Sequence, residues 1–258
     1  MRNSQKKIIL TGTSGLIGKQ LCLELIDAGY FVIGIDKVTS NFTNENFFEI
    51  IFDMKDISSY SILKEKILQK TNSVYSLINL AAYNPSVESG LPEFSISNLD
   101  LSTWDEEIRI NMTSPLFLIK ELETLLFKEV SLGRNPRVIN VVSTYGLVPP
   151  NQSIYKSLSD EQIFKPIGYP VSKAGLNMIT KYLATYPPYR EIRFNSVAPG
   201  GVFNNQPEEF VASYSKMTPV GRMAEVREIT SVFLYLLSDE STYIHGQVFA
   251  IDGGWTTW

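Results

Sequence analysis

Tyr169 and Lys173 stand four positions apart, a spacing that places two side chains on one face of a helix, one turn from each other. An ammonium group beside a phenol favours the phenolate and so lowers the pKa of the phenol. A phenol tuned in this way can give or take a proton near neutral pH. The pair alone proves little, because a chain with 13 tyrosines contains such spacings by chance. Its meaning depends on the residues around it.

Two further polar residues extend this pair into a candidate proton-transfer site. Ser143 directly follows an apolar run that ends at Val142, so its hydroxyl falls at the carboxyl end of a predicted strand. Asn111 lies within a long predicted helix, where asparagine is a poor helix former, and there it could bend the helix and hold a water molecule for proton relay. We therefore predict a catalytic group made of Asn111, Ser143, Tyr169 and Lys173.

Three glycines, Gly12, Gly15 and Gly18, follow the first predicted strand and open the first predicted helix. Glycines at such a turn let backbone N–H groups approach a pyrophosphate, and the positive end of the following helix then faces the anion. The alternative is an ordinary turn between a strand and a helix. The residues predicted to bind the phosphates are Gly12, Ser14, Gly15, Leu16, Ile17 and Gly18.

Asp36 ends the second predicted strand, where a carboxylate can accept hydrogen bonds from both ribose hydroxyls and repels a 2′-phosphate. The glycine turn also holds no basic residue, so NAD is favoured over NADP, although Lys19 and Lys37 argue the other way. The alternative is that Asp36 simply opens a loop. Asp53, after the third predicted strand, could bind the adenine amino group or cap a helix, and we place the neighbouring Met54 in the same cofactor site.

The elements that must position these residues alternate along the chain. Apolar runs without polar/apolar alternation are typical of a parallel sheet covered on both faces, and alternating strands and helices are typical of a doubly wound fold. We predict a single α/β domain over residues 1–258, a Rossmann-type doubly wound parallel sheet of about seven strands with helices on both faces. The predicted strands are Lys7–Thr11, Phe31–Asp36, Phe48–Phe52, Ser76–Ala81, Arg137–Val142, Ile192–Val197 and Gln247–Ile251. The predicted helices are Ile17–Ala28, Ser58–Gln69, Thr103–Glu129, Gly168–Thr185 and Val226–Leu237.

Composition excludes several classes of protein. The 258 residues include 23 Lys and Arg against 27 Asp and Glu, for a net charge of -4, which argues against nucleic-acid binding. The single cysteine, Cys22, excludes an internal disulfide, and the single histidine, His245, excludes a His-rich metal site. We expect no metal ion, no membrane partner and a cytoplasmic location, since no apolar stretch approaches the length of a membrane span.

Taken together and in order, these segments resemble the short-chain dehydrogenase/reductase family, in its shorter branch, over the whole chain. The motifs that carry the resemblance are the glycine turn, Asn79-Leu80-Ala81-Ala82, Asn111, Ser143, Tyr169 with Lys173, Asn195-Ser196-Val197-Ala198-Pro199-Gly200 and Asp252-Gly253-Gly254. Tyr169 is then expected to act as general acid/base, and Lys173 to lower its pKa and bind the nicotinamide ribose. Ser143 would polarise the substrate oxygen, and Asn111 would anchor the relay water.

The resemblance also implies partners and further cofactor contacts. A hydride would move between nicotinamide and a hydroxyl or carbonyl carbon of a small-molecule substrate. The subunits would assemble as a homotetramer or homodimer. The further cofactor contacts implied are Asn79, Ala81, Ala82, Pro199, Gly200 and Val202, in addition to Tyr169 and Lys173.

Three features depart from the pattern of this branch. The middle glycine, Gly15, falls one residue earlier than usual. The 26-residue step from Ser143 to Tyr169 is about twice the usual length, so extra residues within 147–167 would lie beside the substrate. Asn204 replaces a threonine that touches the cofactor carboxamide, from which we expect altered geometry and retained binding.

The two least regular segments, about 147–167 and 202–223, follow predicted strands and supply amides and hydroxyls. Such groups suit a polyhydroxylated substrate better than a long acyl chain. Both segments are similar to members of the family found in flagellin and polysaccharide modification, which points to a sugar or a sugar phosphate. The predicted substrate residues are Ser143, Tyr145, Asn151, Gly201 and Asn204.

The sequence therefore predicts an NAD-dependent oxidoreductase for a small polar substrate. One alternative is an NADPH-dependent 3-ketoacyl-type reductase, which Asp36 and the polar loops disfavour. A second is a sugar-nucleotide epimerase or dehydratase, which the glycine spacing suggests and the short chain disfavours. A third is a non-catalytic NAD(H)-binding sensor, which would have no need of Ser143, Tyr169 and Lys173.

Overall fold

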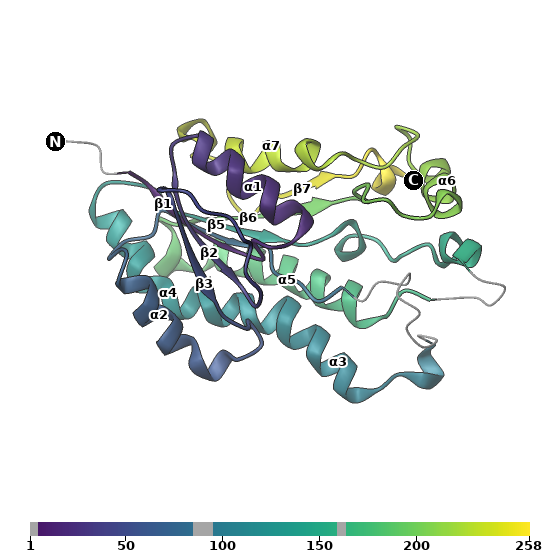
Figure 1. The fold of residues 1–258 in the computed structure, drawn as a ribbon, viewed down its shortest axis with the longest axis horizontal. Coiled ribbons are helices and arrows are strands. Elements are labelled where there is room, and N and C mark those ends of the chain that lie inside the picture. The colour runs from purple at the N-terminus through teal and green to yellow at the C-terminus, as the bar shows by residue number, and fades with distance from the viewer. Residues whose placement is uncertain (1–4, 85–94, 159–163) are drawn as a thin grey trace.

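The computed structural model describes residues 5–84, 95–158 and 164–258 of the chain. Their strands form one seven-stranded sheet in the order β3-β2-β1-β4-β5-β6-β7, and every neighbouring pair is parallel (Figure 1). The strand order reverses between β1 and β4, which is the switch point where open α/β sheets bind ligands. The predicted doubly wound parallel sheet is confirmed. The strands are β1 Lys7–Thr11, β2 Phe31–Asp36, β3 Phe47–Ile51, β4 Ser76–Asn79, β5 Arg137–Val141, β6 Arg193–Pro199 and β7 Val248–Ile251.

Helices cover both faces of the sheet (Figure 1). Helices α1 (Leu16–Asp27) and α7 (Val226–Leu237) pack together on one face. Helices α2 (Tyr60–Leu68), α4 (Ser114–Ser131) and α5 (Gly168–Thr185) lie on the other. The central strands are consequently buried on both sides, and all five residues of β5 are buried. This explains why the apolar runs of the sequence lack alternation.

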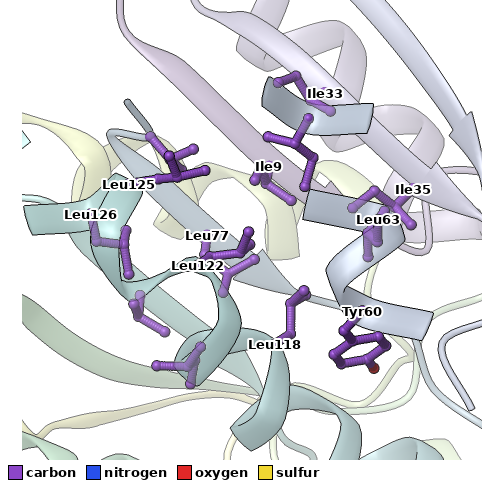
Figure 2. Close-up of a cluster of buried hydrophobic side chains, with 14 of the residues drawn as sticks. Ile9, Ile33, Ile35, Tyr60, Leu63, Leu77, Leu118, Leu122, Leu125 and Leu126 are labelled. Atoms are coloured by element: carbon purple, nitrogen blue, oxygen red, sulfur yellow. The ribbon is translucent and has the colours of Figure 1, made fainter. Parts of the chain in front are cut away.

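The core on the α2–α4 face is built largely from leucine and isoleucine (Figure 2). Ile9 and Ile33 from the sheet meet Leu63 of α2 and Leu122 of α4, and all four are fully buried. Each such side chain contributes ~1.5–3 kcal/mol relative to an exposed one. The packing fixes the two helices against the strands, and with them the loops at the carboxyl edge of the sheet.

The long helix predicted over Thr103–Glu129 is interrupted. Helix α3 (Leu101–Ile108) passes into a π-helical turn, Arg109–Thr113, before α4 begins. Asn111 lies in that turn and is fully buried. A π turn adds a residue to the backbone ring and is frequent at functional sites. The helix that was predicted to be continuous is therefore interrupted around Asn111 by a local change in helix type.

The segment 202–223, predicted to be irregular, contains a helix, α6 (Glu208–Met217). This prediction was wrong because α6 is amphipathic: Phe210 and Tyr214 are one turn apart and pack against Tyr155 and Trp255. In the other predicted loop, 147–167, residues Gln152–Leu158 form a 3-10 helix, and residues 159–163 lie outside the described residues. Within the described parts of the chain, no helix combines the length and the apolar character needed to cross a membrane.

Candidate active site

The glycine turn between β1 and α1 is sterically committed to glycine at two positions. Gly12 has a φ of +78°, and a methyl group there would lie 2.9 Å from Cα of Ala81. A methyl group on residue 18 would overlap the carbonyl group of Gly12. Gly15 is different, since its nearest obstacle is the Gly12 oxygen at 3.4 Å, which is ordinary contact. Glycine at position 15 therefore leaves space toward the cavity in front of the turn.

A cavity of about 530 Å³ opens in front of this turn. Asp36 lies in its wall, and its Oδ2 accepts a hydrogen bond of 2.9 Å from the backbone N–H of Ser14. Its Oδ1 accepts a second one from the N–H of Val38. The carboxylate is thus fixed beside the turn. The predicted cofactor residues that line this cavity are Gly12, Ser14, Gly15, Leu16, Ile17, Gly18, Asp36, Asp53, Met54, Ala81 and Ala82.

Asn79, which was also predicted to bind the cofactor, lies elsewhere. It is buried, and its amide donates a 2.8 Å hydrogen bond to Oδ1 of Asn140 on the adjacent strand. Thr11, which was not predicted to have a role, holds the backbone after β4: its Oγ1 accepts hydrogen bonds from the N–H groups of Leu80 and Ala81, each at 3.0 Å. A threonine that ends an apolar strand gives no sequence signal for this role.

A second cavity, of about 430 Å³, continues from the first and shares four wall residues with it. Those shared residues are Ile17, Leu80, Ala82 and Asn84. The structure brings three of the four predicted catalytic residues to its wall: Ser143 follows β5, while Tyr169 and Lys173 lie on the first turns of α5. The predicted cofactor and substrate residues in this wall are Tyr145, Pro199, Gly200, Gly201, Val202 and Asn204.

The Lys173 side chain is anchored by the backbone of β5. Lys173 is 2% exposed, and its ammonium donates a 2.8 Å hydrogen bond to the carbonyl oxygen of Val141. Burial lowers the pKa of Lys173 to about 7. Burial raises the pKa of the Tyr169 phenol above its ordinary value, and the nearby Ser143 hydroxyl lowers it by less.

The raised pKa of Tyr169 differs from the expectation that Lys173 lowers it. The ammonium lies 5.8 Å from the centroid of the Tyr169 ring and is directed to the Val141 carbonyl, so its effect on the phenol is small. A second ammonium is closer: Nζ of Lys165 lies 4.8 Å from the same centroid and donates a hydrogen bond to Oδ1 of Asn84. Lys165 comes from the extra residues between Ser143 and Tyr169.

Asn111 is not in the wall of either cavity. Its Oδ1 accepts a 2.8 Å hydrogen bond from the N–H of Tyr83, and its Nδ2 donates to the Tyr83 carbonyl at 2.9 Å. Nδ2 is also 3.2 Å from Oγ of Ser172. In this structure the amide therefore holds the segment after β4 against α5, instead of presenting itself to a relay water.

Aromatic hydroxyls form much of the substrate side. Tyr145 and Tyr155 share a hydrogen bond of 3.0 Å between their hydroxyl groups, and burial raises the pKa of both. Tyr214 of α6 accepts a 2.5 Å hydrogen bond from the N–H of Gly201. Sequence reasoning missed Tyr155 and Tyr214, although the amphipathic spacing of α6 could have revealed the latter.

Asn151 was predicted to contact the substrate and does not line the cavity. Its Oδ1 accepts hydrogen bonds from the N–H and the hydroxyl of Ser153, at 3.0 and 2.7 Å, so it caps the following 3-10 turn. Asparagine favours such local turns because its short side chain reaches the backbone two residues ahead. The backbone N–H of Asn204 donates to Gln206 within the same wall.

The two cavities fit a dinucleotide. The first offers a turn that a Cβ would fill, the N-terminus of α1, where Gly15 provides no side-chain cap, and a fixed carboxylate, which together suit phosphates and a ribose. The second offers a phenol, a hydroxyl and an ammonium at the carboxyl edge of the sheet. This arrangement can hold a nicotinamide cofactor and exchange a proton with a ligand oxygen.

Comparison with known proteins agrees with this geometry. A family described as "Enoyl-(Acyl carrier protein) reductase" matches residues 34–256. The chain is similar to a 3-oxoacyl-[acyl-carrier-protein] reductase of Buchnera aphidicola, with 27% identity over 98% of both chains. It is also similar to the post-translational flagellin modification protein A of Campylobacter coli, with 28% identity over 97% of this chain and 98% of that one.

A solved structure extends the likeness to the whole fold. The short-chain dehydrogenase of Leptospira borgpetersenii with bound NAD+ superposes with a TM-score of 0.85 and 28% identity, over 98% of this chain and 93% of that one. The family match covers more than half of the chain, and the order of the parallel sheet agrees with the fold of the solved relative. The chain therefore belongs to the short-chain dehydrogenase/reductase family of oxidoreductases.

Proposed function

We propose that this protein is an NAD-dependent oxidoreductase that acts on a hydroxyl or carbonyl carbon of a small polar substrate, a sugar or a sugar phosphate. The observation that carries the proposal is the continuity of the two cavities, with Tyr169, Lys173 and Ser143 in the wall of the second. The nicotinamide cofactor supplies the hydride chemistry. The chain supplies binding, orientation and proton transfer.

Tyr169 is the group that exchanges a proton with the substrate oxygen. Because burial keeps its pKa above the ordinary value, the hydroxyl retains its proton at neutral pH and can donate it to a carbonyl oxygen. Oxidation of an alcohol needs the phenolate and is expected to become faster at alkaline pH. Ser143 lies in the same cavity wall as Tyr169, and we assign its hydroxyl to the same substrate oxygen.

Lys173 and Asn111 position the groups that take part in proton transfer. We assign Lys173, anchored on the Val141 carbonyl, to the hydroxyl groups of the nicotinamide ribose. Asn111 fixes the segment that includes Tyr83, which lines the first cavity. The cofactor and the phenol are thereby held on one rigid edge of the sheet, and such positioning accounts for a large part of enzymatic rate enhancement.

The preference for NAD is supported by Asp36. Its carboxylate accepts hydrogen bonds from the backbone at 2.9 and 3.2 Å, so it is fixed where a 2′-phosphate would be repelled. The wall of the same cavity also includes Lys37, the residue that would favour NADP. A carboxylate held by two backbone amides is better placed than a lysine side chain, and we take it as the dominant group.

A small polar substrate is supported by the lining of the second cavity. Its wall carries hydroxyl or amide groups from Ser143, Tyr145, Tyr155, Asn204 and Gln206. Groups of this kind can hydrogen-bond several hydroxyls of one molecule. The likeness to a flagellin modification protein agrees with a sugar substrate.

A 3-ketoacyl-type reductase is the second candidate, favoured by one specific observation. A cavity of about 970 Å³ adjoins the catalytic one and shares Tyr145 and Lys165 with it. Leu147, Val148 and Phe164 give part of its wall an apolar character that suits an acyl chain. The likeness to 3-oxoacyl-[acyl-carrier-protein] reductases agrees with this alternative.

We further propose that the protein forms a homodimer or homotetramer. The outer face of α5 exposes Val171, Met178 and Tyr182, at a spacing that forms one stripe along the helix. Met178 and Tyr182 are each more than 60% exposed, which is costly unless a partner covers them. Light scattering of the wild type and of Met178→Glu tests this, because a charged residue in a subunit contact is expected to shift the mass toward the monomer.

Parallel titrations with NADH and NADPH test the proposed function. Trp255 stacks on Tyr214 of the second cavity with 4.5 Å between ring centroids, so energy transfer to a bound reduced nicotinamide reports occupancy. Tighter NADH binding, followed by NAD reduction with a member of a panel of sugars and sugar phosphates, is the expected result. Tighter NADPH binding with turnover of a 3-ketoacyl thioester would establish the second candidate instead.

A further inference from the structure

A buried glutamate lies directly behind the first turn of α5. Of the eight residues of α3, all of them described, Glu107 alone is fully buried, at 0% exposure. Neither of its carboxyl oxygens has a hydrogen-bond partner among the described residues. An ionised carboxylate in such a place loses its hydration without compensation. A residue of this type at the one buried position of a helix calls for a functional explanation.

The carboxyl group of Glu107 occupies the N-terminus of α5. A methyl group on Gly168, the first residue of α5, would overlap Oε2 of Glu107. The residue before the helix, Ile167, provides no side-chain cap. The first N–H groups of a helix have no partner within it and attract negative charge. Glu107, which belongs to α3, thus occupies the position that a side-chain cap of α5 would occupy.

The groups that face Glu107 come from three segments. Tyr169 follows Gly168 on α5, and its N–H approaches the carboxyl closely enough to lower the pKa of Glu107. Lys165, from the segment before α5, lowers that pKa as well. Tyr83 lies in the segment after β4, and its pKa is raised by burial and, to a smaller extent, by the charges of Glu106 and Glu107. Burial outweighs both lowering effects and raises the pKa of Glu107 to about 7.

The charge of Glu107 also reaches the catalytic phenol. Ionisation of Glu107 raises the pKa of Tyr169, because two negative charges close together are unfavourable. When two groups interact in this way, their protons are lost in coupled steps. The proton on Glu107 and the proton on Tyr169 are therefore linked through the first turn of α5.

We propose that Glu107 is a positioning residue for Tyr169: its carboxyl group lies against Gly168 and seats the first turn of α5, the turn that carries the phenol. The inference rests on the proposed function, in which Tyr169 transfers the proton. Its consequence is that the protonation state of Glu107 sets how readily Tyr169 gives up its proton. A carboxylic acid at this position favours phenolate formation, and a carboxylate favours the protonated phenol.

The ionisation of Glu107 can be measured without a substrate. Infrared difference spectra of protein containing isotope-labelled glutamate, recorded against pH, should show a carboxyl band that titrates near pH 7 and is absent from Glu107→Gln. Glu65→Gln, the same change at an exposed position of α2, should retain the band. Loss of the band between pH 4 and 5 in the wild type, as for an ordinary glutamate, would overturn the proposal.

The effect on Tyr169 is measured from phenolate absorbance. The titration of Tyr169 is the difference between a protein and its Tyr169→Phe counterpart, taken in the wild-type and Glu107→Gln backgrounds. The neutral amide should shift this titration to lower pH. An unchanged titration together with lower thermal stability would show that Glu107 is structural only, and would overturn the proposal.

A second variant decides the matter if Glu107→Gln does not fold. Lys165→Met removes a positive charge that favours the carboxylate, so the labelled band should move to higher pH. A band that does not move would overturn the proposal. The proposed function fails on a different result, namely full turnover by Tyr169→Phe, which would leave the infrared and absorbance measurements interpretable.

Discussion

The two continuous cavities are built in different ways. The first cavity, in front of the glycine turn, is called the dinucleotide cavity below. It is formed mainly by the turn between β1 and α1, and backbone groups make its critical contacts. The second cavity, called the catalytic cavity below, gathers side chains from β5, from β6, from α6 and from the segment that precedes α5. These segments lie far apart in the sequence. A cofactor shared by many enzymes can be recognised by the backbone, whereas a particular substrate requires side chains. Substitutions should therefore act differently in the two cavities.

Tyr169→Phe is expected to have the largest effect and to separate the two cavities. Without the hydroxyl no proton is exchanged with the substrate oxygen, so turnover should fall ~10²–10⁴-fold. The affinity for NADH should remain close to that of the wild type, since the dinucleotide cavity is untouched. Steady-state kinetics and the fluorescence titration measure the two quantities. Tyr243→Phe, at a fully exposed position, is the matched control, and unchanged turnover in Tyr169→Phe would refute the assigned role.

Gly18→Ala and Gly15→Ala separate two roles of the glycine turn, namely its contribution to stability and its contribution to NADH binding. The new methyl group on residue 18 would overlap the Gly12 carbonyl, so the free energy of unfolding should fall by ~1–3 kcal/mol. Gly15→Ala meets only ordinary contacts, so stability should be retained while NADH affinity falls, because the methyl group takes space in the cavity. Urea unfolding measures the stability of both variants, and NADH titration measures their affinity. Equal stability of the two variants would contradict the steric argument.

Asp36→Ala should change cofactor choice more than stability. The variant loses a carboxylate fixed by the N–H groups of Ser14 and Val38 and the repulsion of a 2′-phosphate. A change of ~1.4 kcal/mol corresponds to a factor of about ten in the ratio of NADH to NADPH affinity, and we expect a decrease of that order. Asp27→Ala, exposed at the end of α1, is the control. A ratio that stays constant would assign the preference to another residue.

Tyr155→Phe should have a smaller effect, confined to the catalytic cavity. It removes the hydrogen bond between the hydroxyls of Tyr145 and Tyr155, worth ~0.5–1.5 kcal/mol. We expect a raised KM for the substrate, a modest loss of stability and unchanged NADH affinity. A loss of NADH affinity equal to the change in KM would show that the two cavities are not separable in this way.

The smallest effect is expected far from both cavities, at His245. Its Nδ1 accepts from the N–H of Phe194 and its Nε2 lies 2.7 Å from the Ala184 carbonyl, while burial lowers its pKa. The unfolded chain therefore binds a proton more readily than the folded one. Stability should be fully present above the ordinary histidine pKa of 6.5 and decline as the pH falls below it. Thermal unfolding of the wild type and His245→Asn between pH 5 and 8 measures this, and a parallel decline in both would exclude His245 as the cause.

Local sequence patterns predicted those features of the fold that depend on residues close together in the chain. Every strand was located to within about two residues, because an apolar β-branched run in this alternation has few other folded states. The glycine turn was recognisable in part for the same reason, since Gly18 is required by its contact with Gly12 inside the turn, whereas the contact that constrains Gly12 comes from Ala81 after β4. The prediction of α6 failed because its apolar stripe is short and has meaning only against Tyr155 and Trp255.

The catalytic site shows the same division. Tyr169 and Lys173 are one helical turn apart and could be paired from the sequence, and the strand order brings Ser143 beside them. Asn79 and Asn151 were misplaced because an amide has many possible partners, and the ones it finds, Asn140 and Ser153, depend on the fold. Burial, which sequence spacing does not report, raises the pKa of Tyr169, and the Lys173 ammonium lies 5.8 Å from the centroid of its ring.

The sequence by itself determined the alternation of strands and helices, the glycine turn after β1 and the pairing of Tyr169 with Lys173, since each depends mainly on the periodicity or conformation of adjacent residues. The tertiary structure alone decided which amides face the cavities, how far burial shifts the pKa values of the site, and that Glu107 lies behind Tyr169. These depend on packing between segments far apart in the chain. Burial and its electrostatic cost arise only when those segments meet.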